Sequence, residues 1–369
     1  MNKNYRILEF CLSDGQGGLE LYMLNITSQL RSRGHVVYSI TRPGTFLFEA
    51  LQGEMNQPFE RPKLHKLFFV ANKIACYFEA RRIDIVHLHW GYDLPLVTVV
   101  KRLCKRPVKL IYSRQMQITK SKRDPYHWLL YSQLDLFTAI TRKLLKEAQQ
   151  YLPMSPGKID LLRYGITPAD GIGDCESFLR GMDLSPGWFS IGCFSRIEYA
   201  KGQHLLLEAL SMLSAEGVEV QAVIVGHVMD PAYRERLEDQ IQGDGLGEQL
   251  RFMDFIKDPM KVMPCFDVIV LPTFEETFGL VLVEAMSMGV AVIGSRAGGV
   301  PEIIDHGVTG LMFESGNSRD LASTLRTLHR DPELRKELAT RGCGSARENY
   351  SDGSHMERLE EFFARVIAT

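Results

Sequence analysis

Two glutamates in the second half of the sequence are spaced so that both could reach one ligand. Glu276 and Glu284 are separated by seven residues, and Glu284 lies in the otherwise apolar stretch from Val281 to Met286. Burying an unpaired carboxylate there is costly, so Glu284 needs a hydrogen-bonding partner. Two vicinal hydroxyls of a sugar would serve, and an ion pair with a neighbouring loop is the alternative.

Two cations precede these glutamates in the sequence. Arg196 and Lys201 lie five residues apart in a loop that follows the expected strand Phe189–Phe194. Arginine offers a bidentate fork and lysine a mobile point charge, so together they could clamp a diphosphate. Two solvated loop cations would be the simpler interpretation if this loop stood alone.

Backbone N–H groups at a helix start could complete a phosphate site. Thr277 is expected to cap a helix that begins directly after it. The N–H groups of Phe278, Gly279 and Leu280 would then point at whatever lies beyond the helix start, where the helix dipole favours an anion. These three residues are therefore candidate phosphate-binding positions.

A second set of bare N–H groups lies near the start of the chain. Gly17 and Gly18 fall between an expected strand and an expected helix, where the backbone can approach an anion. A dinucleotide site is excluded, because the spacing from Gly15 is not Gly-x-Gly-x-x-Gly and no acidic residue ends the second strand. The remaining alternative is that these glycines only permit tight packing of strand against helix.

The elements that position these residues follow an alternating pattern. Short β-branched runs alternate with helical patterns, which is typical of parallel sheets covered by helices. We expect an α/β protein with two doubly wound domains at residues 1–165 and 175–350, a Gly- and Pro-rich hinge from Tyr164 to Gly187, and a helix at about 355–369 that packs back on the first domain. The expected strands are Arg6–Cys11, Val36–Ile40, Ile85–Leu88, Lys109–Tyr112, Leu136–Ala139 and Lys158–Leu161, then Phe189–Phe194, Val220–Val225, Leu250–Met253, Val268–Leu271, Val290–Gly294 and Gly310–Phe313.

Length and composition exclude several classes of protein. The chain has 369 residues, 45% of them apolar and 24% charged, which is enough for real cores and unlike a disordered or fibrous chain. Apolar stretches such as Val268–Leu271 fall far short of the ~20 residues of a membrane span. With no signal-peptide pattern at its start, the chain is expected to stay in the cytoplasm.

The seven cysteines are odd in number, scattered, and never in a Cys-x-x-Cys pair. This favours buried thiols over a disulfide frame, and neither a zinc site nor another metal site is expected. The cysteines are Cys11, Cys76, Cys104, Cys175, Cys193, Cys265 and Cys343.

The charges are unevenly distributed. Residues 1–165 carry a net charge of +12, and the remainder carries −14. This imbalance favours an anionic partner for the first half, although each basic segment could also be the solvent-exposed face of an ordinary helix. Three basic clusters contribute: Lys63, Lys66 and Lys73 among apolar residues; Lys101, Arg102, Lys105, Arg106 and Lys109; and Lys120, Lys122 and Arg123.

Taken together, these features resemble the family 4 retaining glycosyltransferases of the GT-B fold. The resemblance rests on the order and spacing of the two glutamates, the two cations and the early glycine pair. It also rests on the motifs Gly-Gly-Val-Pro-Glu at 298–302 and Gly-Val-Thr-Gly-Leu at 307–311, and it spans nearly the whole chain.

The resemblance implies two Rossmann-like domains facing a central cleft, and metal-independent sugar transfer from a nucleoside-diphosphate sugar. Glu284 would bind the nucleotide ribose, while Arg196, Lys201 and Glu276 would be the catalytic residues. The two cations would hold the diphosphate and Glu276 the transferred sugar, with the backbone N–H groups around the phosphates. Retention in this family is explained by front-face attack in which the leaving phosphate takes the acceptor proton, so no cofactor or protein nucleophile is expected.

One position departs from the family pattern. Family members often have a histidine after the strand that corresponds to Lys109–Tyr112, close to the transferred sugar. Here Gln115 stands near that place and offers hydrogen bonds but no titratable group. His89 is a further acceptor-side candidate, as are His87 and His127, although a histidine at a strand end is more often a structural hydrogen-bonding residue.

Acceptor recognition in such enzymes falls to the N-terminal domain, where the positive charge collects. This implies a lipid-linked or anionic saccharide acceptor, such as lipopolysaccharide core or an envelope polysaccharide precursor, and peripheral contact with the inner face of the cytoplasmic membrane. Two alternatives are a sugar-nucleotide epimerase of related fold, which would act on the donor alone, and a non-catalytic basic binding module. Nucleic acid is disfavoured because the site carboxylates would repel its phosphates.

Overall fold

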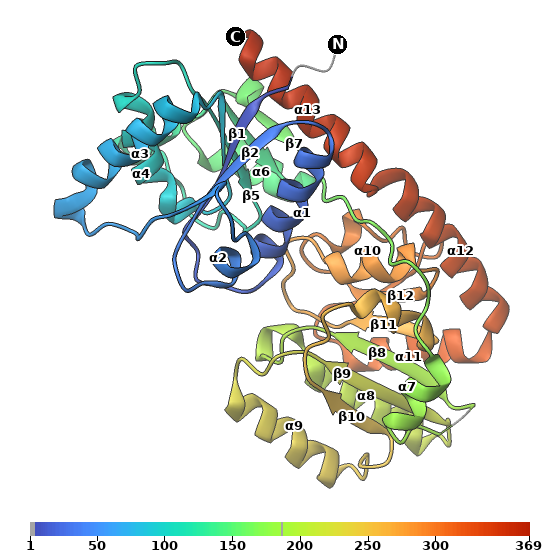
Figure 1. The fold of residues 1–369 in the computed structure, drawn as a ribbon. Helices are drawn as coiled ribbons and strands as arrows, with labels where there is room; N and C mark the ends of the chain where they lie inside the picture. The colour runs from blue at the N-terminus through green and yellow to red at the C-terminus, as the bar shows by residue number, and fades with distance from the viewer. Residues whose placement is uncertain (1–3, 186) are drawn as a thin grey trace. The chain divides into compact units, whose positions relative to one another are not determined.

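The structure is a computed structural model that describes residues 4–185 and 187–369 (Figure 1). The chain divides into two compact units, Met1–Arg163 with Gly353–Thr369, and Tyr164–Asp352. Each unit is an α/β domain with its own parallel sheet, as the sequence predicts. In the described part of the chain, no helix combines the length and the apolar character that crossing a membrane would require.

The first unit contains a seven-stranded sheet in the order β3-β2-β1-β4-β5-β6-β7. Six of its strands lie within two residues of their predicted bounds, because most of them are short buried runs rich in apolar residues. Its strands are β1 Arg6–Cys11, β2 Val36–Thr41, β3 Asn56–Pro58, β4 Ile85–Leu88, β5 Lys109–Arg114, β6 Leu136–Ala139 and β7 Ile159–Leu161. Its helices are α1 Gly18–Ser32, α2 Phe46–Ala50, α3 Leu67–Arg81, α4 Leu94–Leu103, α5 Pro125–Tyr131, α6 Arg142–Tyr151 and α13 Asp352–Ala368.

The edge strand β3 was not predicted. It has only three residues, Asn-Gln-Pro, without a β-branched or aromatic side chain. Its pairing with β2 and the bonds of Asn56 Oδ1 with Ser39 and Thr41 hold it in place. Only the tertiary environment therefore makes this segment a strand.

The C-terminal helix α13, red in Figure 1, belongs to the same unit as the N-terminal strand β1. Just after α1, Arg33 forms an ion pair with Glu360 of α13 at 3.1 Å, and His35 forms a hydrogen bond with the same carboxylate at 3.0 Å. The ring of Phe363 packs edge-on against Tyr5. These contacts tie the last helix to the first sheet.

The second unit contains a six-stranded sheet in the order β10-β9-β8-β11-β12-β13. Every strand lies within one residue of its predicted bounds. Its strands are β8 Phe189–Phe194, β9 Val220–Val225, β10 Leu250–Met253, β11 Val268–Leu271, β12 Ala291–Ser295 and β13 Leu311–Phe313. Its helices are α7 Cys175–Gly181, α8 Gln203–Ala215, α9 Pro231–Gly243, α10 Leu280–Ser287, α11 Ser318–Arg330 and α12 Pro332–Asn349.

The chain order reverses between β1 and β4 in the first sheet, and between β8 and β11 in the second. In open α/β sheets, ligands bind beyond the carboxyl ends of the strands at such a reversal. The loops that follow these four strands are therefore the places to look for functional residues.

The segment expected as a hinge, Tyr164 to Gly187, falls within the second unit. Ile166 forms a parallel bridge with Ser351, and the N–H of Gly173 donates to the carbonyl of Lys261. The segment also contains the short helix α7. Pro186, which belongs to the same stretch, lies outside the described residues.

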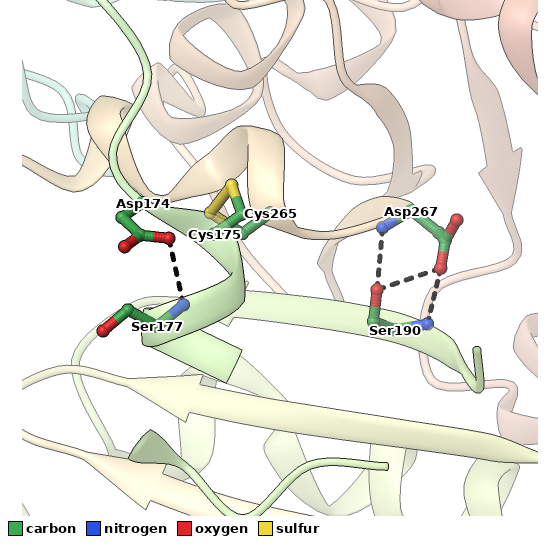
Figure 2. The surroundings of a disulfide bond; sticks show 6 residues. All are labelled: Asp174, Cys175, Ser177, Ser190, Cys265 and Asp267. Carbon is green, nitrogen blue, oxygen red and sulfur yellow. Dashed lines mark hydrogen bonds between the residues drawn. A yellow bond between two sulfur atoms is a disulfide. The ribbon is translucent and has the colours of Figure 1, made fainter. Parts of the chain in front are cut away.

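A disulfide joins Cys175 to Cys265, which corrects the expectation that all seven cysteines are buried thiols (Figure 2). Cys175 opens α7 and Cys265 lies just before β11, 90 residues later in the chain. Asp174 accepts a hydrogen bond from the N–H of Ser177 and so fixes the start of α7 beside the bridge (Figure 2). Of the other cysteines, Cys11 and Cys193 are buried, Cys104 and Cys343 are half-buried, and Cys76 is exposed.

Breaking this disulfide is expected to destabilise the second unit. A bridge that closes a loop of this length typically contributes about 2–4 kcal/mol, chiefly by restricting the unfolded chain. The double variant Cys175→Ser with Cys265→Ser should lose that much in urea unfolding of the oxidised protein, and Cys343→Ser is the control. If a reducing agent left the unfolding midpoint of the wild type unchanged, the bridge would not contribute to stability.

Candidate functional site

The candidate residues of the second unit lie on loops at the reversal of its sheet. Arg196 and Lys201 follow β8, and Glu276 follows β11, the strand that pairs with β8. Because the carboxyl ends of parallel strands meet at one edge of the sheet, these loops are neighbours although 75 residues separate Lys201 from Glu276.

Lys201 and Glu276 form an ion pair. The Nζ atom of Lys201 lies 2.8 Å from Oε2 of Glu276, and both side chains are mostly buried. The other carboxylate oxygen, Oε1, accepts a hydrogen bond from the N–H of Thr277. The pair fixes the ammonium group in place and leaves it with N–H donors for an anionic ligand.

Two glycines allow the loops around this pair to touch. Gly202 has φ +68°, and a Cβ atom there would lie 2.1 Å from the carbonyl oxygen of Pro272. Gly298 has φ +58°, and its Cβ would lie 1.8 Å from the carbonyl oxygen of Glu276. Any other residue would strain the backbone and push these loops apart.

A stack of aromatic rings braces the same loops, and sequence reasoning missed it. Tyr199, two residues before Lys201, stacks on Phe274 with ring centroids 5.6 Å apart and on His204 at 4.9 Å. The N–H of Phe274 donates to the carbonyl of Ala200. No local pattern could reveal a contact between rings so far apart in the chain.

Arg196 is placed differently from Lys201. Its guanidinium pairs with Glu198 at 2.9 Å, and the side chain is 56% exposed. It is therefore a mobile cation at the rim of the loop, whereas Lys201 is held by its partner.

The helix that follows β11 begins later than predicted, so the expectation that Thr277 caps it is wrong. α10 starts at Leu280, and the residue before it is Gly279, which has φ +101°. Thr277 cannot be the cap because two residues intervene, and a left-handed turn at Gly279 starts the helix instead. The N–H groups of Gly279 and Leu280 have no acceptor among the described residues, whereas the ring of Phe278 is buried against Tyr164.

Glu284 lies on α10, and its carboxyl group forms no hydrogen bond or ion pair with any residue that the structure describes. The alternative of an ion pair with a neighbouring loop is therefore not realised among those residues. Burial raises the pKa of Glu284 to about 7. The carboxyl group is thus partly ionised near neutral pH and can accept hydrogen bonds from a ligand.

In the first unit, the glycine loop after β1 is held by a residue that the sequence analysis did not single out. Glu20 accepts from the N–H of Gly17 at 2.9 Å and from the hydroxyl of Ser13 at 2.5 Å. The N–H of Gly17 is therefore already used, and of the two predicted donors only Gly18 lacks an acceptor in the described chain. A glutamate three residues after a helix cap is a known signal that could have identified Glu20.

Gln115 and His89 follow the neighbouring strands β5 and β4, and both are buried. Nε2 of Gln115 and Nδ1 of His89 have no hydrogen-bond partner among the described residues. A buried polar atom without a partner is costly, so a ligand that reached either atom would relieve that cost.

Glu9, His87 and His89 form a cluster whose nitrogen and oxygen atoms lie within 4.8 Å of one another. This composition could bind a metal, but the carboxylate of Glu9 already accepts hydrogen bonds from Nδ1 of His87 at 3.3 Å and from Nε2 of His89 at 2.5 Å. Although burial alone would raise it, the pKa of Glu9 is held at about 2 because both imidazoles favour its charged form. The cluster is thus a buried hydrogen-bond network that holds Nε2 of His89 on Glu9 and leaves Nδ1 of the same ring without a partner among the described residues.

Comparison with known proteins agrees with these features. Residues 16–170 match the family model described as Glycosyltransferase Family 4, and residues 189–343 match Glycosyl transferases group 1. The N-acetyl-alpha-D-glucosaminyl L-malate synthase of Bacillus anthracis is 24% identical over 95% of this chain and 94% of its own. A lipopolysaccharide core biosynthesis mannosyltransferase of Rhizobium leguminosarum is 24% identical over 69% of this chain and 70% of its own.

Solved structures share the fold over the whole chain. A glycosyltransferase of Rickettsia africae has a TM-score of 0.90 at 20% identity and covers 99% of both chains. Anabaena Alr3699/HepE, solved in complex with UDP, has a TM-score of 0.84 at 22% identity over 98% of this chain and 100% of its own. With two family models matched along most of its length and two parallel α/β units, this chain belongs to family 4 of the glycosyltransferases and is an enzyme of the GT-B fold.

Proposed function

We propose that this glycosyltransferase moves a sugar, with retention, from a nucleoside-diphosphate sugar to a saccharide or lipid-linked acceptor in lipopolysaccharide or envelope polysaccharide synthesis. The observation that carries the proposal is the unpaired carboxyl of Glu284 in the same unit as the Lys201–Glu276 pair. The UDP in the Anabaena structure and the name of the Rhizobium relative support the donor class and the pathway.

In this proposal each side chain has a separate role at the donor. Glu284 accepts hydrogen bonds from the ribose hydroxyls, because its carboxyl has no partner within the described chain. Lys201 and Arg196 bind the diphosphate, and Glu276 binds hydroxyls of the transferred sugar. The N–H groups of Gly279 and Leu280 add donors at the positive end of α10.

The chemistry needs charge stabilisation more than it needs a protein nucleophile. Breaking the bond to the leaving diphosphate places negative charge on its oxygen, and preorganised donors stabilise that charge. Lys201 suits this role because its ion pair with Glu276 already fixes the ammonium position. The acceptor hydroxyl attacks from the same face and passes its proton to the leaving phosphate, without a metal ion.

Replacing Lys201 tests this assignment. Lys201→Ala should lose roughly 2–4 kcal/mol of transition-state stabilisation, a fall of about 30- to 1,000-fold that appears mainly in kcat. The matched control is Lys336→Ala, which removes an exposed lysine of α12. Wild-type turnover in Lys201→Ala would remove this residue from the site, and loss of activity in EDTA that added Mg²⁺ or Mn²⁺ restored would refute the metal-free route.

Calorimetric titration with UDP and with GDP separates the two glutamates. Glu284→Gln should weaken binding of the free nucleotide, whereas Glu276→Gln should slow transfer and leave nucleotide binding nearly unchanged. Because the pKa of Glu284 lies at about 7, the wild-type affinity should rise between pH 6 and pH 8 as the carboxyl ionises and becomes a better acceptor. Glu284→Gln should lose this part of the rise, and equal affinity losses in both variants would contradict the assignment.

One basic segment of the first unit has the surface expected of a lipid-contacting face. We define the apolar–basic face as Leu64, Phe68 and Phe69, which are 87%, 67% and 62% exposed, with Lys63, Lys66 and Lys73. Exposed aromatic and aliphatic side chains beside lysines fit the interface of an anionic bilayer. We propose that this face holds the enzyme at the inner face of the cytoplasmic membrane, near a lipid-linked or anionic acceptor.

The second basic cluster, Lys101, Arg102, Lys105, Arg106 and Lys109, is partly paired with acidic residues. Lys101 donates to Asp135 at 2.5 Å, Lys109 lies 3.9 Å from the same carboxylate, and Arg106 lies 3.8 Å from Asp84. Two carboxylates thus pair with three of the five cations, whereas Arg102 and Lys105 are exposed and have no acidic side-chain partner among the described residues. Because the cluster is partly neutralised and has no large exposed apolar side chain, the apolar–basic face is the better candidate for membrane contact.

Liposome sedimentation tests the apolar–basic face. Binding to phosphatidylglycerol vesicles should fall steeply between low and physiological salt, where the Debye length is about 8 Å. Phe68→Ser with Phe69→Ser should abolish binding because the inserted rings are lost. The control is Ile172→Ser with Val308→Ser, which removes two exposed apolar side chains of the second unit. Absence of binding at low salt would overturn this proposal.

A further inference from the structure

The reversal of the first sheet carries a group of side chains that the donor site does not use. Trp90 and Tyr92 follow β4, and Arg61 lies three residues after β3. The guanidinium carbon of Arg61 lies 3.9 Å from the ring centroid of Trp90 and 5.8 Å from that of Tyr92. The two aromatic centroids are 5.2 Å apart.

Asp93 holds the guanidinium group of Arg61 in place. Its Oδ1 lies 3.2 Å from Nη2 of Arg61, and its Oδ2 accepts from the N–H of Leu12 at 2.8 Å. Leu12 follows β1, so one buried carboxyl joins the loops after the two strands at which the sheet reverses. The guanidinium is therefore held in one orientation over the indole ring.

Of the two aromatic rings, that of Trp90 packs against the core and that of Tyr92 is exposed to solvent. Trp90 is half-buried and packs on the small core that contains Cys11 and Met23. Gly91 has no room for a side chain, because a Cβ there would lie 2.6 Å from the hydroxyl oxygen of Tyr112. Tyr92 comes next and is 71% exposed, which is unusual for so large an aromatic side chain.

This combination of groups matches the surface of a sugar. The C–H face of a pyranose ring packs on an aromatic ring, while its hydroxyl or carboxylate oxygens accept from charged N–H donors. Arg61 uses Nη2 for Asp93, and its Nη1 and Nε atoms have no acceptor among the described residues. Carboxylate and phosphate groups are the ligands that a guanidinium fork binds best.

We propose that Arg61, Trp90 and Tyr92 form a subsite for an acidic sugar residue of the acceptor. The sugar ring stacks on Tyr92 beside Trp90, and Arg61 binds its carboxylate or phosphate group. The position agrees with the rule that α/β sheets bind ligands at a reversal of strand order. The role as an acceptor subsite rests on the proposed function, whereas binding of an acidic saccharide can be measured without it.

The test is an array of oligosaccharides in matched pairs, in which each uronate- or phosphate-bearing glycan stands beside its neutral counterpart. Wild-type protein should retain acidic glycans in preference to the neutral ones. Arg61→Met should weaken acidic binding about tenfold or more, the effect of losing a charge-assisted hydrogen bond, and erase the preference. Tyr92→Ala should weaken both classes about three- to tenfold, because the stacking ring is lost.

Two controls and a second readout make the result decisive. Arg180→Met and Tyr126→Ala remove an exposed arginine and an exposed tyrosine elsewhere, and both should bind glycans as the wild type does. Tyr92→Ala keeps the proposal testable if Arg61→Met misfolds, because the exposed ring of Tyr92 does not pack in the core. No preference for acidic glycans, or equal binding in wild type, Arg61→Met and Tyr92→Ala, would overturn the subsite.

Titration with UDP or GDP in the same variants separates the two proposals. The subsite variants should bind nucleotide as the wild type does, because they alter only the first unit. If the wild type bound neither nucleotide yet still needed Arg61 for acidic glycans, the donor assignment would fail and the subsite would stand. If nucleotide bound normally and glycans did not, only the subsite would fall.

Discussion

Close approach of main chain to main chain is the constraint on which the site of the second unit depends. The loops after β8, β11 and β12 touch only because Gly202 and Gly298 carry no Cβ. With these loops in contact, Lys201 reaches Glu276 and the stack of Tyr199 on Phe274 can form. A larger residue at either glycine would separate the partners of the ion pair, so the glycines determine the electrostatics although they carry no charge.

The electrostatics of this site are incomplete in a way that favours a ligand. The Lys201 ammonium has one carboxylate partner and spare donors, whereas the Glu284 carboxyl has no partner in the described chain and a pKa raised by burial to about 7. Leaving polar groups unsatisfied costs stability that a complementary ligand offsets on binding. A nucleotide sugar carries both complements, since its diphosphate is an acceptor and its ribose hydroxyls are donors.

The first unit uses the same architecture for a different chemistry. Its sheet also reverses beside its first strand, and there Asp93 joins the two loops by binding Leu12 and Arg61. The groups available to a ligand there are the ring of Tyr92 and the guanidinium of Arg61. In the second unit they are the ammonium of Lys201 and the carboxyl of Glu284. In our proposals one fold thus supplies two sites of unlike preference, because the sheet sets the position and the loop residues set the ligand.

The sequence alone determined twelve strands, the glycosyltransferase family and the chemical types of the residues at the proposed donor site. The strands follow from local signals, namely β-branched runs and turn residues, which act within a few residues. The family follows from the order and spacing of motifs along the chain. The tertiary structure decided the start of α10, where a left-handed Gly279 replaced the expected Thr277 cap, and the weak edge strand β3. It also decided the pairings of Cys175 with Cys265 and of Lys201 with Glu276, because partners 90 and 75 residues apart meet only when the sheet brings their loops together.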